Sequence, residues 1–219
     1  MCTEVQLEKA EFFRALGAER LARVRPLIRE RRFARQELLY VEGQSAESLW
    51  VLGSGAVRLY KTSPDGRVTT LEVLQPGEIF GAVSALDEAT YPASAEAVSD
   101  TVAWTLPRSS FLRLLAEEPR LGVEILTVVT RRLHAAHERL RAFAHDPAPA
   151  RLARELLRAA RAGEAQVTRR ALAEAAGTTV ETAIRVLRRF HRQGIIRGSV
   201  GRVSVLDERA LRRIAGIGV

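Results

Sequence analysis

A narrow apolar stripe along one long predicted helix constrains this chain most. Residues 119–144 have the pattern of one continuous helix, and the proline at its start suits a first helical turn. Charged side chains occupy its other sides, whereas a helix that packs only on its own domain usually has a wider stripe. The apolar residues alternate at spacings of three and four, at Leu126, Val129, Leu133, Ala136, Leu140 and Phe143. The spacing predicts a parallel contact between two copies of this helix; an amphipathic helix packed only on its own domain is the alternative.

A proline-rich segment and a step in charge follow this helix at the same place. His145-Asp146-Pro147-Ala148-Pro149 predicts a hinge, because proline cannot continue a helix. Residues 1–146 carry 19 Lys and Arg against 20 Asp and Glu, whereas residues 147–219 carry 15 Arg against 6 Asp and Glu. We therefore expect a near-neutral domain at 1–117, a helix and hinge at 118–146, and a basic domain at 147–219. An arginine-rich composition bias is the alternative, but such a bias would not be confined to one domain.

Short apolar runs separated by turn residues fill the N-terminal part. Residues 4–30 have the spacing of short helices, and from Phe33 to Leu106 short β-rich runs alternate with glycine and proline turns. Ser63-Pro64-Asp65-Gly66 predicts a hairpin turn between two of these runs. The pattern predicts an antiparallel sandwich or roll, and the chain as a whole an α+β fold.

Composition narrows the class of protein. Apolar residues make up 47% and charged residues 27%, as in folded globular chains. No apolar run approaches the roughly 20 residues of a membrane helix, and no secretory signal begins the sequence. There is one cysteine, and no arrangement of catalytic or metal-binding residues stands out. We therefore expect a cytoplasmic protein with no membrane contact, no metal site and no enzymatic activity.

The basic third has the pattern of two helices, a tight turn and a hairpin. Thr168 is expected to cap one helix, Gly177 to supply the turn, and Thr178 or Thr179 to cap a second helix that runs to about Arg192. The predicted buried face of the second helix consists of Ala183, Val186, Leu187 and Phe190. A wing is expected to follow, with Ile195–Arg197 pairing with Val203–Leu206 around Ser199-Val200-Gly201-Arg202. This pattern predicts a winged helix-turn-helix that binds double-stranded DNA; a basic helical bundle that binds protein is the alternative.

Residues that face away from the predicted core are the candidates for DNA contact. A glutamate can accept from cytosine, an arginine can reach guanine, and an apolar side chain can touch the thymine methyl, so Glu181, Arg185 and Ile184 are assigned to base reading. Phosphate contacts supply affinity without sequence preference. They are assigned to Thr168, Arg169, Arg170, Thr179, Thr182, Arg188, Arg189 and Arg202.

In this order the parts resemble the CRP/FNR family of bacterial regulators. The roll signature is carried by Gly53–Arg58 and Pro76–Gly81, and Thr178–Thr182 followed by Arg185-Val186-Leu187 resembles an FNR-type recognition helix. The resemblance implies a cyclic-nucleotide-binding-like β-roll, a dimerisation helix and a winged helix-turn-helix. It also implies a homodimer on an inverted-repeat operator, with RNA polymerase as a partner. Glu181 and Arg185 map onto the family's base-reading pair, and Val180, a further base-reading candidate, stands where CRP-type members carry an arginine.

The departures from the family pattern concern the effector that the β-roll would bind. Ala82-Val83 follows Phe80-Gly81 where cyclic-AMP-binding members carry a ribose-binding glutamate, and Ala93-Ser94 stands in place of their phosphate-binding Arg-Ser pair. Cyclic AMP is therefore not expected, and a single cysteine excludes an iron–sulfur cluster. A haem-dependent gas or redox sensor stays open, with Cys2 and His137 as the candidate ligands and a solvated histidine as the alternative. The effector pocket is predicted at Gly77, Glu78, Phe80, Gly81, Ser94 and His137, and a signal there is expected to rotate the DNA-binding domain about Asp146–Pro149.

Overall fold

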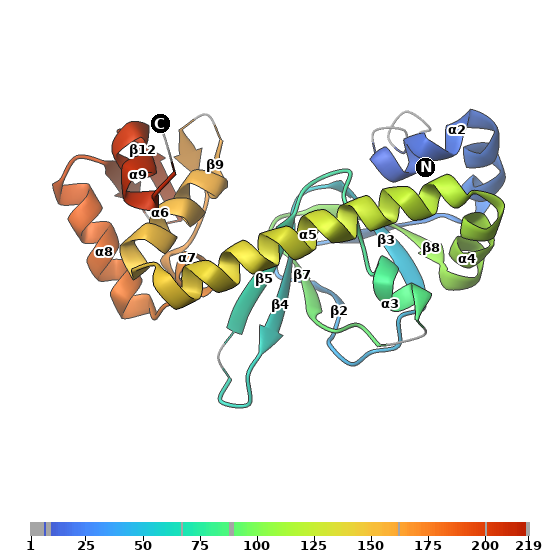
Figure 1. Cartoon of the computed structure of the whole chain (residues 1–219), viewed down its shortest axis with the longest axis horizontal. Coiled ribbons are helices and arrows are strands. Elements are labelled where there is room, and N and C mark those ends of the chain that lie inside the picture. The colour runs from blue at the N-terminus through green and yellow to red at the C-terminus, as the bar shows by residue number, and fades with distance from the viewer. Residues whose placement is uncertain are drawn as a thin grey trace. The chain divides into compact units, whose positions relative to one another are not determined.

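The structure is a computed structural model that describes residues 7, 10–66, 68–87, 90–161, 163–199 and 201–217. Its contacts divide the chain into two compact units, Met1–Leu133 and His134–Val219 (Figure 1). The division falls inside the long helix α5 (Pro119–His145), so each unit carries part of that helix.

The N-terminal unit is built on two antiparallel sheets of four strands each (Figure 1). One sheet has the order β1-β8-β3-β6, from Arg29–Phe33, Thr101–Pro107, Ser48–Ser54 and Ile79–Phe80. The other has the order β2-β7-β4-β5, from Leu38–Tyr40, Ser94–Ala97, Val57–Thr62 and Val68–Leu74. The predicted antiparallel roll is therefore confirmed, and so is the hairpin between β4 and β5.

Side chains from both sheets meet in one buried cluster. Trp50 of β3 stacks on Phe80 of β6, and both rings approach Tyr40 of β2. The indole Nε1 of Trp50 donates to the hydroxyl of Tyr91 at 2.9 Å, and that hydroxyl donates to the carbonyl of Ser48 at 3.2 Å. The polar groups of Trp50 and Tyr91 are thus satisfied inside the roll.

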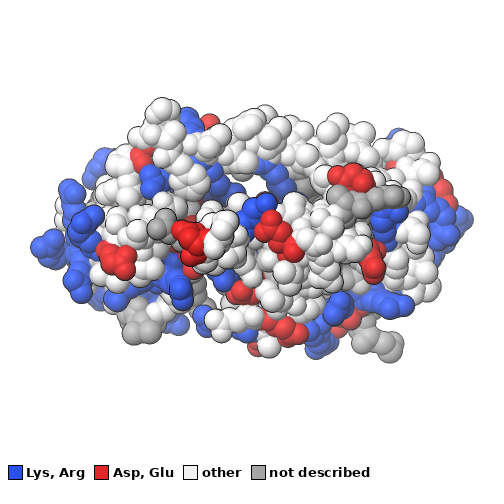
Figure 2. Space-filling view, turned by 90° about the horizontal axis from the view of Figure 1, so that it is seen from below, with Lys and Arg blue, Asp and Glu red and all other residues white. Residues whose placement is uncertain are grey.

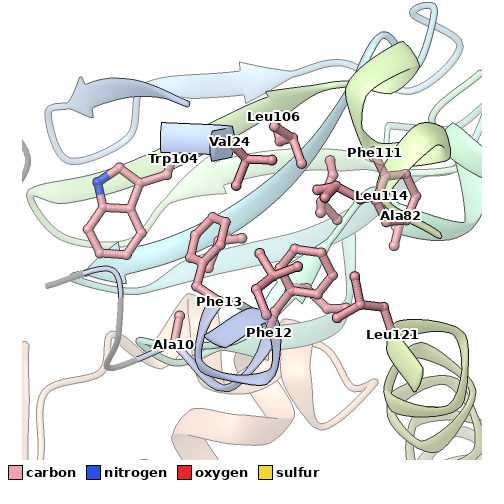
Figure 3. Close-up of a cluster of buried hydrophobic side chains, with 14 of the residues drawn as sticks. Ala10, Phe12, Phe13, Val24, Ala82, Trp104, Leu106, Phe111, Leu114 and Leu121 are labelled. Carbon is pink, nitrogen blue, oxygen red and sulfur yellow. The ribbon is translucent and has the colours of Figure 1, made fainter. Parts of the chain in front are cut away.

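Helices cover the outer face of the first sheet. Figure 3 shows side chains of α2 (Glu11–Val24) and α4 (Arg108–Glu117) pointing toward residues of β8. Phe13 lies edge-on to Trp104, with ring centroids 6.2 Å apart, and Phe12 lies next to Phe111. Leu121, in the first turns of α5, belongs to the same cluster and fastens the start of that helix to the roll.

Beyond this start, α5 exposes a row of large apolar side chains. Ile125 is buried against the roll, and Val129 is partly buried against the same cluster. The exposed fractions are 64% for Leu126, 52% for Leu133, 68% for Leu140 and 41% for Phe143. The row follows the predicted three-and-four spacing, so most of the stripe is not covered by the described part of its own chain.

The C-terminal unit is a winged helix-turn-helix, as predicted. Its helices are α6 (Ala148–Ala159), α7 (Arg169–Ala175), α8 (Val180–Arg192) and α9 (Glu208–Ala215). Its sheet has the order β11-β12-β10-β9, from Ile196–Ser199, Arg202–Val205, Glu164–Ala165 and Ala160–Arg161. The four residues predicted for the buried face of α8 all lie in its core, which also includes Leu152, Leu156 and Leu211.

Several elements were not predicted from the sequence. Strand β1 lies across the boundary between the predicted helical segment, which ended at residue 30, and the predicted β-rich region, which began at Phe33. It was missed because its sequence Arg-Glu-Arg-Arg-Phe has almost no apolar alternation. The short helix α3 (Ala82–Leu86), helix α4, strands β6, β9 and β10, and helix α9 were also missed. Pro149 was assigned to the hinge, but it lies in the first turn of α6, where the absent N–H costs no helical hydrogen bond.

Asp146 connects the end of α5 to α6. Its carboxylate pairs with the guanidinium of Arg154 and lies 3.7 Å from that of Arg141. Arg154 also donates from Nε to the carbonyl of Ala215 at the end of α9, at 2.8 Å. The hydrogen bond from Arg154 lowers the pKa of Asp146 below its ordinary value of 3.8.

We expect this ion pair to make the stability of the C-terminal unit dependent on acid pH. Because the folded-state pKa is lowered, the stabilisation is complete above pH 3.8 and is lost as the pH falls below it. Melting temperatures measured over this range should fall less steeply for Asp146→Asn than for the wild type. Glu138→Gln, which removes an exposed carboxylate from α5, should keep the wild-type dependence of melting temperature on pH. The same dependence in all three proteins would contradict this role of Asp146.

Candidate nucleic-acid interface

Two side-chain caps fix the helices of the helix-turn-helix. The hydroxyl of Thr168 accepts from the backbone N–H of Ala171 at 3.1 Å, at the start of α7. The hydroxyl of Thr179 accepts from the backbone N–H of Thr182 at 3.2 Å, at the start of α8. The sequence left Thr178 and Thr179 open as the cap of the second helix, and the structure selects Thr179.

The outward face of α8 carries the predicted base-reading residues with different exposures. Glu181 and Arg185 are exposed one turn apart, whereas Ile184 is half-buried. Val180 is also half-buried and packs against the core of the unit. Both charged side chains are therefore available to a ligand in front of α8, and the two apolar ones only in part.

Glu181 is held at the positive end of the helix. Its own backbone N–H, followed by the hydroxyl of Thr179, lowers the pKa of its carboxyl group. Among the described residues, no ion pair within 4.0 Å joins Glu181 to Arg185. The carboxylate thus accepts hydrogen bonds from its own helix end and stays ionised at neutral pH.

The residues predicted to contact phosphates lie on α7, on α8 and in the wing. Arg188 is exposed on α8, Thr182 is half-buried, and Arg169 and Arg170 are exposed at the start of α7. Arg202, at the wing, is exposed and lies 3.7 Å from Glu164. Arg189 is exposed and lines an open groove of about 390 Å³ between α8 and α9. Val200 of the predicted wing lies outside the described residues.

Two exposed arginines in the same region were missed from the sequence. Arg192 ends α8, and Arg197 lies in β11 of the wing. Figure 2 shows Lys and Arg side chains crowded over the part of the molecule that holds the C-terminal unit. The helical spacing from Arg188 to Arg192 could have identified Arg192, whereas Arg197 needed the register of the wing, in which it pairs with Ser204.

The N-terminal unit contains a cavity of about 190 Å³ between the roll and α5. Its walls include Tyr40, Gly81, Ala93 and Ile125, and Arg132 is the one cation among its described lining residues. Nε of Arg132 lies 3.2 Å from the carboxylate of Glu72, and its Nη2 donates to the carbonyl of Ile79 at 2.6 Å. The cavity is therefore mainly apolar, with one charge that is already paired.

Two tyrosines form one wall of this cavity. The rings of Tyr40 and Tyr91 stack with centroids 3.7 Å apart. Burial raises the pKa of both hydroxyl groups, so both are neutral at physiological pH. Together with Gly81, they offer a ligand flat apolar contact.

Of the predicted effector residues, the structure places only Gly81 on this wall. Phe80 lies in the roll core, and the hydroxyl of Ser94 accepts from the backbone N–H of Glu42 at 3.0 Å. The carboxylate of Glu78 accepts from the backbone N–H of Gln75 at 2.6 Å, beside Gly77 in the same turn. His137 is exposed on α5, and Cys2 lies outside the described residues.

Within the described part of the chain, no group of three or more His, Cys, Asp and Glu side chains could hold a metal ion. None of the helices found there has the length and apolar character needed to cross a membrane.

Comparisons with known proteins agree with this architecture. The profile of the cyclic nucleotide-binding domain matches residues 30–118, and that of the Crp-like helix-turn-helix domain matches residues 150–214. The cyclic AMP receptor protein of Thermus thermophilus is 32% identical over 212 residues, which cover 95% of this chain and 98% of that protein. The chain belongs to the CRP/FNR family of transcriptional regulators. This CRP/FNR regulator therefore binds DNA to control transcription.

Other relatives support the same assignment. Transcriptional regulator LdrP, also of Thermus thermophilus, is 35% identical over 200 residues, covering 85% of this chain and 96% of that protein. The structure of FixK2 from Bradyrhizobium japonicum has a TM-score of 0.78 at 26% identity, covering 88% of this chain and 99% of that chain. The curated relatives are transcriptional regulators, which is consistent with a protein that is not an enzyme.

We expect Thr179→Ala to weaken α8. Loss of an N-cap typically costs about 1 kcal/mol, so the free energy of unfolding should fall by about that amount. Thr178→Ala is the matched control, since it removes the same hydroxyl one residue earlier and should cost less. Denaturant unfolding followed by circular dichroism measures both; equal losses would show that Thr179 is not the cap.

Proposed function

We propose that this regulator binds an inverted-repeat operator as a homodimer whose two copies pair through α5. The exposed row at Leu126, Leu133, Leu140 and Phe143 supports this most directly. Large apolar side chains repeated in a heptad pattern are stabilised when a second helix covers them. Val129 and Ala136 complete the seam, although Val129 also packs on the roll.

Each copy reads one half-site with α8. Arg185 reaches both acceptors of a guanine, and Glu181 accepts from a cytosine amino group. The ionised state of Glu181 favours this role, because an ionised carboxylate offers acceptor oxygens only, whereas a protonated one also carries an O–H donor. Ile184 and Val180 supply apolar contact at the edge of the reading face. The phosphate contacts come from the threonines and arginines assigned above, with Arg192 and Arg197 added.

The regulator acts in the cytoplasm, has no catalytic activity, and recruits or blocks RNA polymerase at its operators. Its effector site is the cavity beneath α5, where cyclic AMP is not the ligand. Ala93 lines that cavity without a charge, Ser94 is engaged by the backbone of Glu42, and Arg132 is paired with Glu72. A cyclic phosphate there would find no unpaired cation among the described lining residues.

We expect cyclic AMP to leave the protein unaffected. Since a ligand that binds the folded state raises the melting temperature, saturating cyclic AMP should produce no shift in a thermal scan and no heat in titration calorimetry. A saturable shift would overturn this assignment of the cavity.

The reading role of Arg185 predicts a change in specificity. Arg185→Ala should cost roughly 1–3 kcal/mol on the preferred duplex and relax the preference at one guanine. Selection of random duplexes by the purified protein, followed by titration of each single-base variant, measures both. Arg212→Ala removes a charge on α9, where it pairs with Glu208, and should keep the sequence preference. An equal loss on every duplex would remove Arg185 from the reading role.

The dimer seam predicts a change in oligomeric state. Leu140→Glu should yield monomers at concentrations where the wild type sediments as a dimer, because it places like charges opposite each other in an apolar contact. His134→Glu adds a carboxylate to the same helix outside the seam and should remain dimeric. A dimeric Leu140→Glu protein in sedimentation equilibrium would contradict the assigned seam.

A further inference from the structure

The last turns of α5 contact the turn of the helix-turn-helix. A Cβ atom placed on Gly177 would lie 2.5 Å from Cε1 of Phe143, so the phenyl ring rests directly on the backbone of that turn. Gly177 has a φ of 57°, which glycine adopts without strain. Phe143 is therefore both a residue of the exposed apolar row and a contact of the segment from which α8 begins.

Arg151, in α6, binds the same segments. Its Nε donates to the carbonyl of Ala176 at 2.8 Å, its Nη2 to that of Gly177 at 3.2 Å, and its Nη1 to that of Asp146 at 2.6 Å. Its guanidinium carbon lies 5.6 Å from the centroid of the Phe143 ring, within range of a cation–π contact. One planar side chain with fixed donor directions thus joins the end of α5, the end of α7 and the turn before α8.

We propose that these five residues form a positioning cluster that fixes the direction of α8 relative to the last turns of α5, where the seam ends. The five are Phe143, Asp146, Arg151, Ala176 and Gly177. We name it the Arg151 cluster. It rests on the proposed function, because only a dimer on an inverted repeat has a half-site separation to select. The cluster sets which separation the dimer accepts, and it does so through α8 without contacting a base.

The order of the segments supports this role. Thr179 caps α8 two residues after Gly177, so a displacement of the turn carries the whole recognition helix with it. Arg154 ties the side chain of Asp146 to the end of α9, which gives the end of α5 a second attachment to the same unit. The last turns of α5 consequently belong to the DNA-binding unit, in agreement with the division of the chain before His134. This division lies on the N-terminal side of the Arg151 cluster, whereas the hinge predicted from the sequence is at Asp146–Pro149.

The experiment compares operators that differ only in half-site separation. Full-length wild type and Arg151→Gln are titrated by fluorescence anisotropy against the selected operator, against versions with the half-sites one or two base pairs closer or further apart, and against a single half-site. We expect the wild type to prefer one separation. In Arg151→Gln the affinity ratio between the best and the other separations should fall about fivefold or more, the size of a typical coupling between sites. Affinity for the single half-site should change little.

Three further variants separate geometry from charge and from folding. Arg158→Gln removes the same charge from the same helix, where Arg158 pairs with Glu155, and should keep the wild-type ratio. Arg151→Lys keeps the charge but lacks the planar fork of donors. Its affinity ratio between the best and the other separations should therefore fall as it does in Arg151→Gln. Phe143→Leu keeps an apolar seam residue but removes the ring from Gly177. If Arg151→Gln does not fold, the same affinity ratio is measured on Phe143→Leu, where it should also fall.

The outcomes are distinguishable. A folded, dimeric Arg151→Gln protein that keeps the wild-type ratio would overturn the Arg151 cluster and leave the proposed function standing. A uniform loss of affinity on all duplexes would also overturn it, because a reduced fraction of folded protein acts equally on every separation. A wild type without any preferred separation would contradict the proposed function itself.

Discussion

Helix α5 has more apolar surface than the described part of its own chain covers. The proposed pairing of two copies, and with it the pairing of two DNA-binding units, depends on this uncovered surface. Its first turns are fastened to the roll by Leu121 and Ile125, which belong to the same buried cluster as Phe12 and Phe111. Further along, Leu126, Leu133 and Leu140 stay exposed. Burying a leucine stabilises a structure by about 1.5–3 kcal/mol, so the row favours association with a second copy. A dimer of this kind would bring two DNA-binding units together on one duplex.

The DNA-binding unit separates affinity from specificity. Fifteen arginines against six acidic residues in 147–219 give it an attraction to any duplex. Specificity is assigned to a much smaller set, above all Glu181 and Arg185 on the exposed face of α8. The positive helix end that lowers the pKa of Glu181 keeps it an acceptor, so its selectivity for cytosine would persist at all physiological pH values.

The cavity beneath α5 combines a flat apolar wall with one cation that is already paired. The two stacked tyrosines and Gly81 form the flat apolar wall, while the only cation among the described lining residues, Arg132, is held by Glu72 and the carbonyl of Ile79. A ligand that displaces Glu72 from Arg132 would act directly on α5, since Arg132 is a residue of that helix. The contact between α5 and the roll is therefore the point at which occupancy of the cavity could affect the helix.

Elements with strong local signals could be predicted from the amino-acid sequence. The alternating strands and their turns predicted the roll, the threonine caps and Gly177 predicted the helix-turn-helix, and the buried face of α8 was predicted residue by residue, because each depends on spacing within one element. The relations between elements required the folded chain. Folding places the charged strand β1 beside β8, since backbone pairing, and not apolar alternation, holds it there. It also places Arg132 in the cavity and joins Phe143, Arg151 and Gly177, because contacts across a packed interior join residues distant in sequence, and no local pattern encodes them.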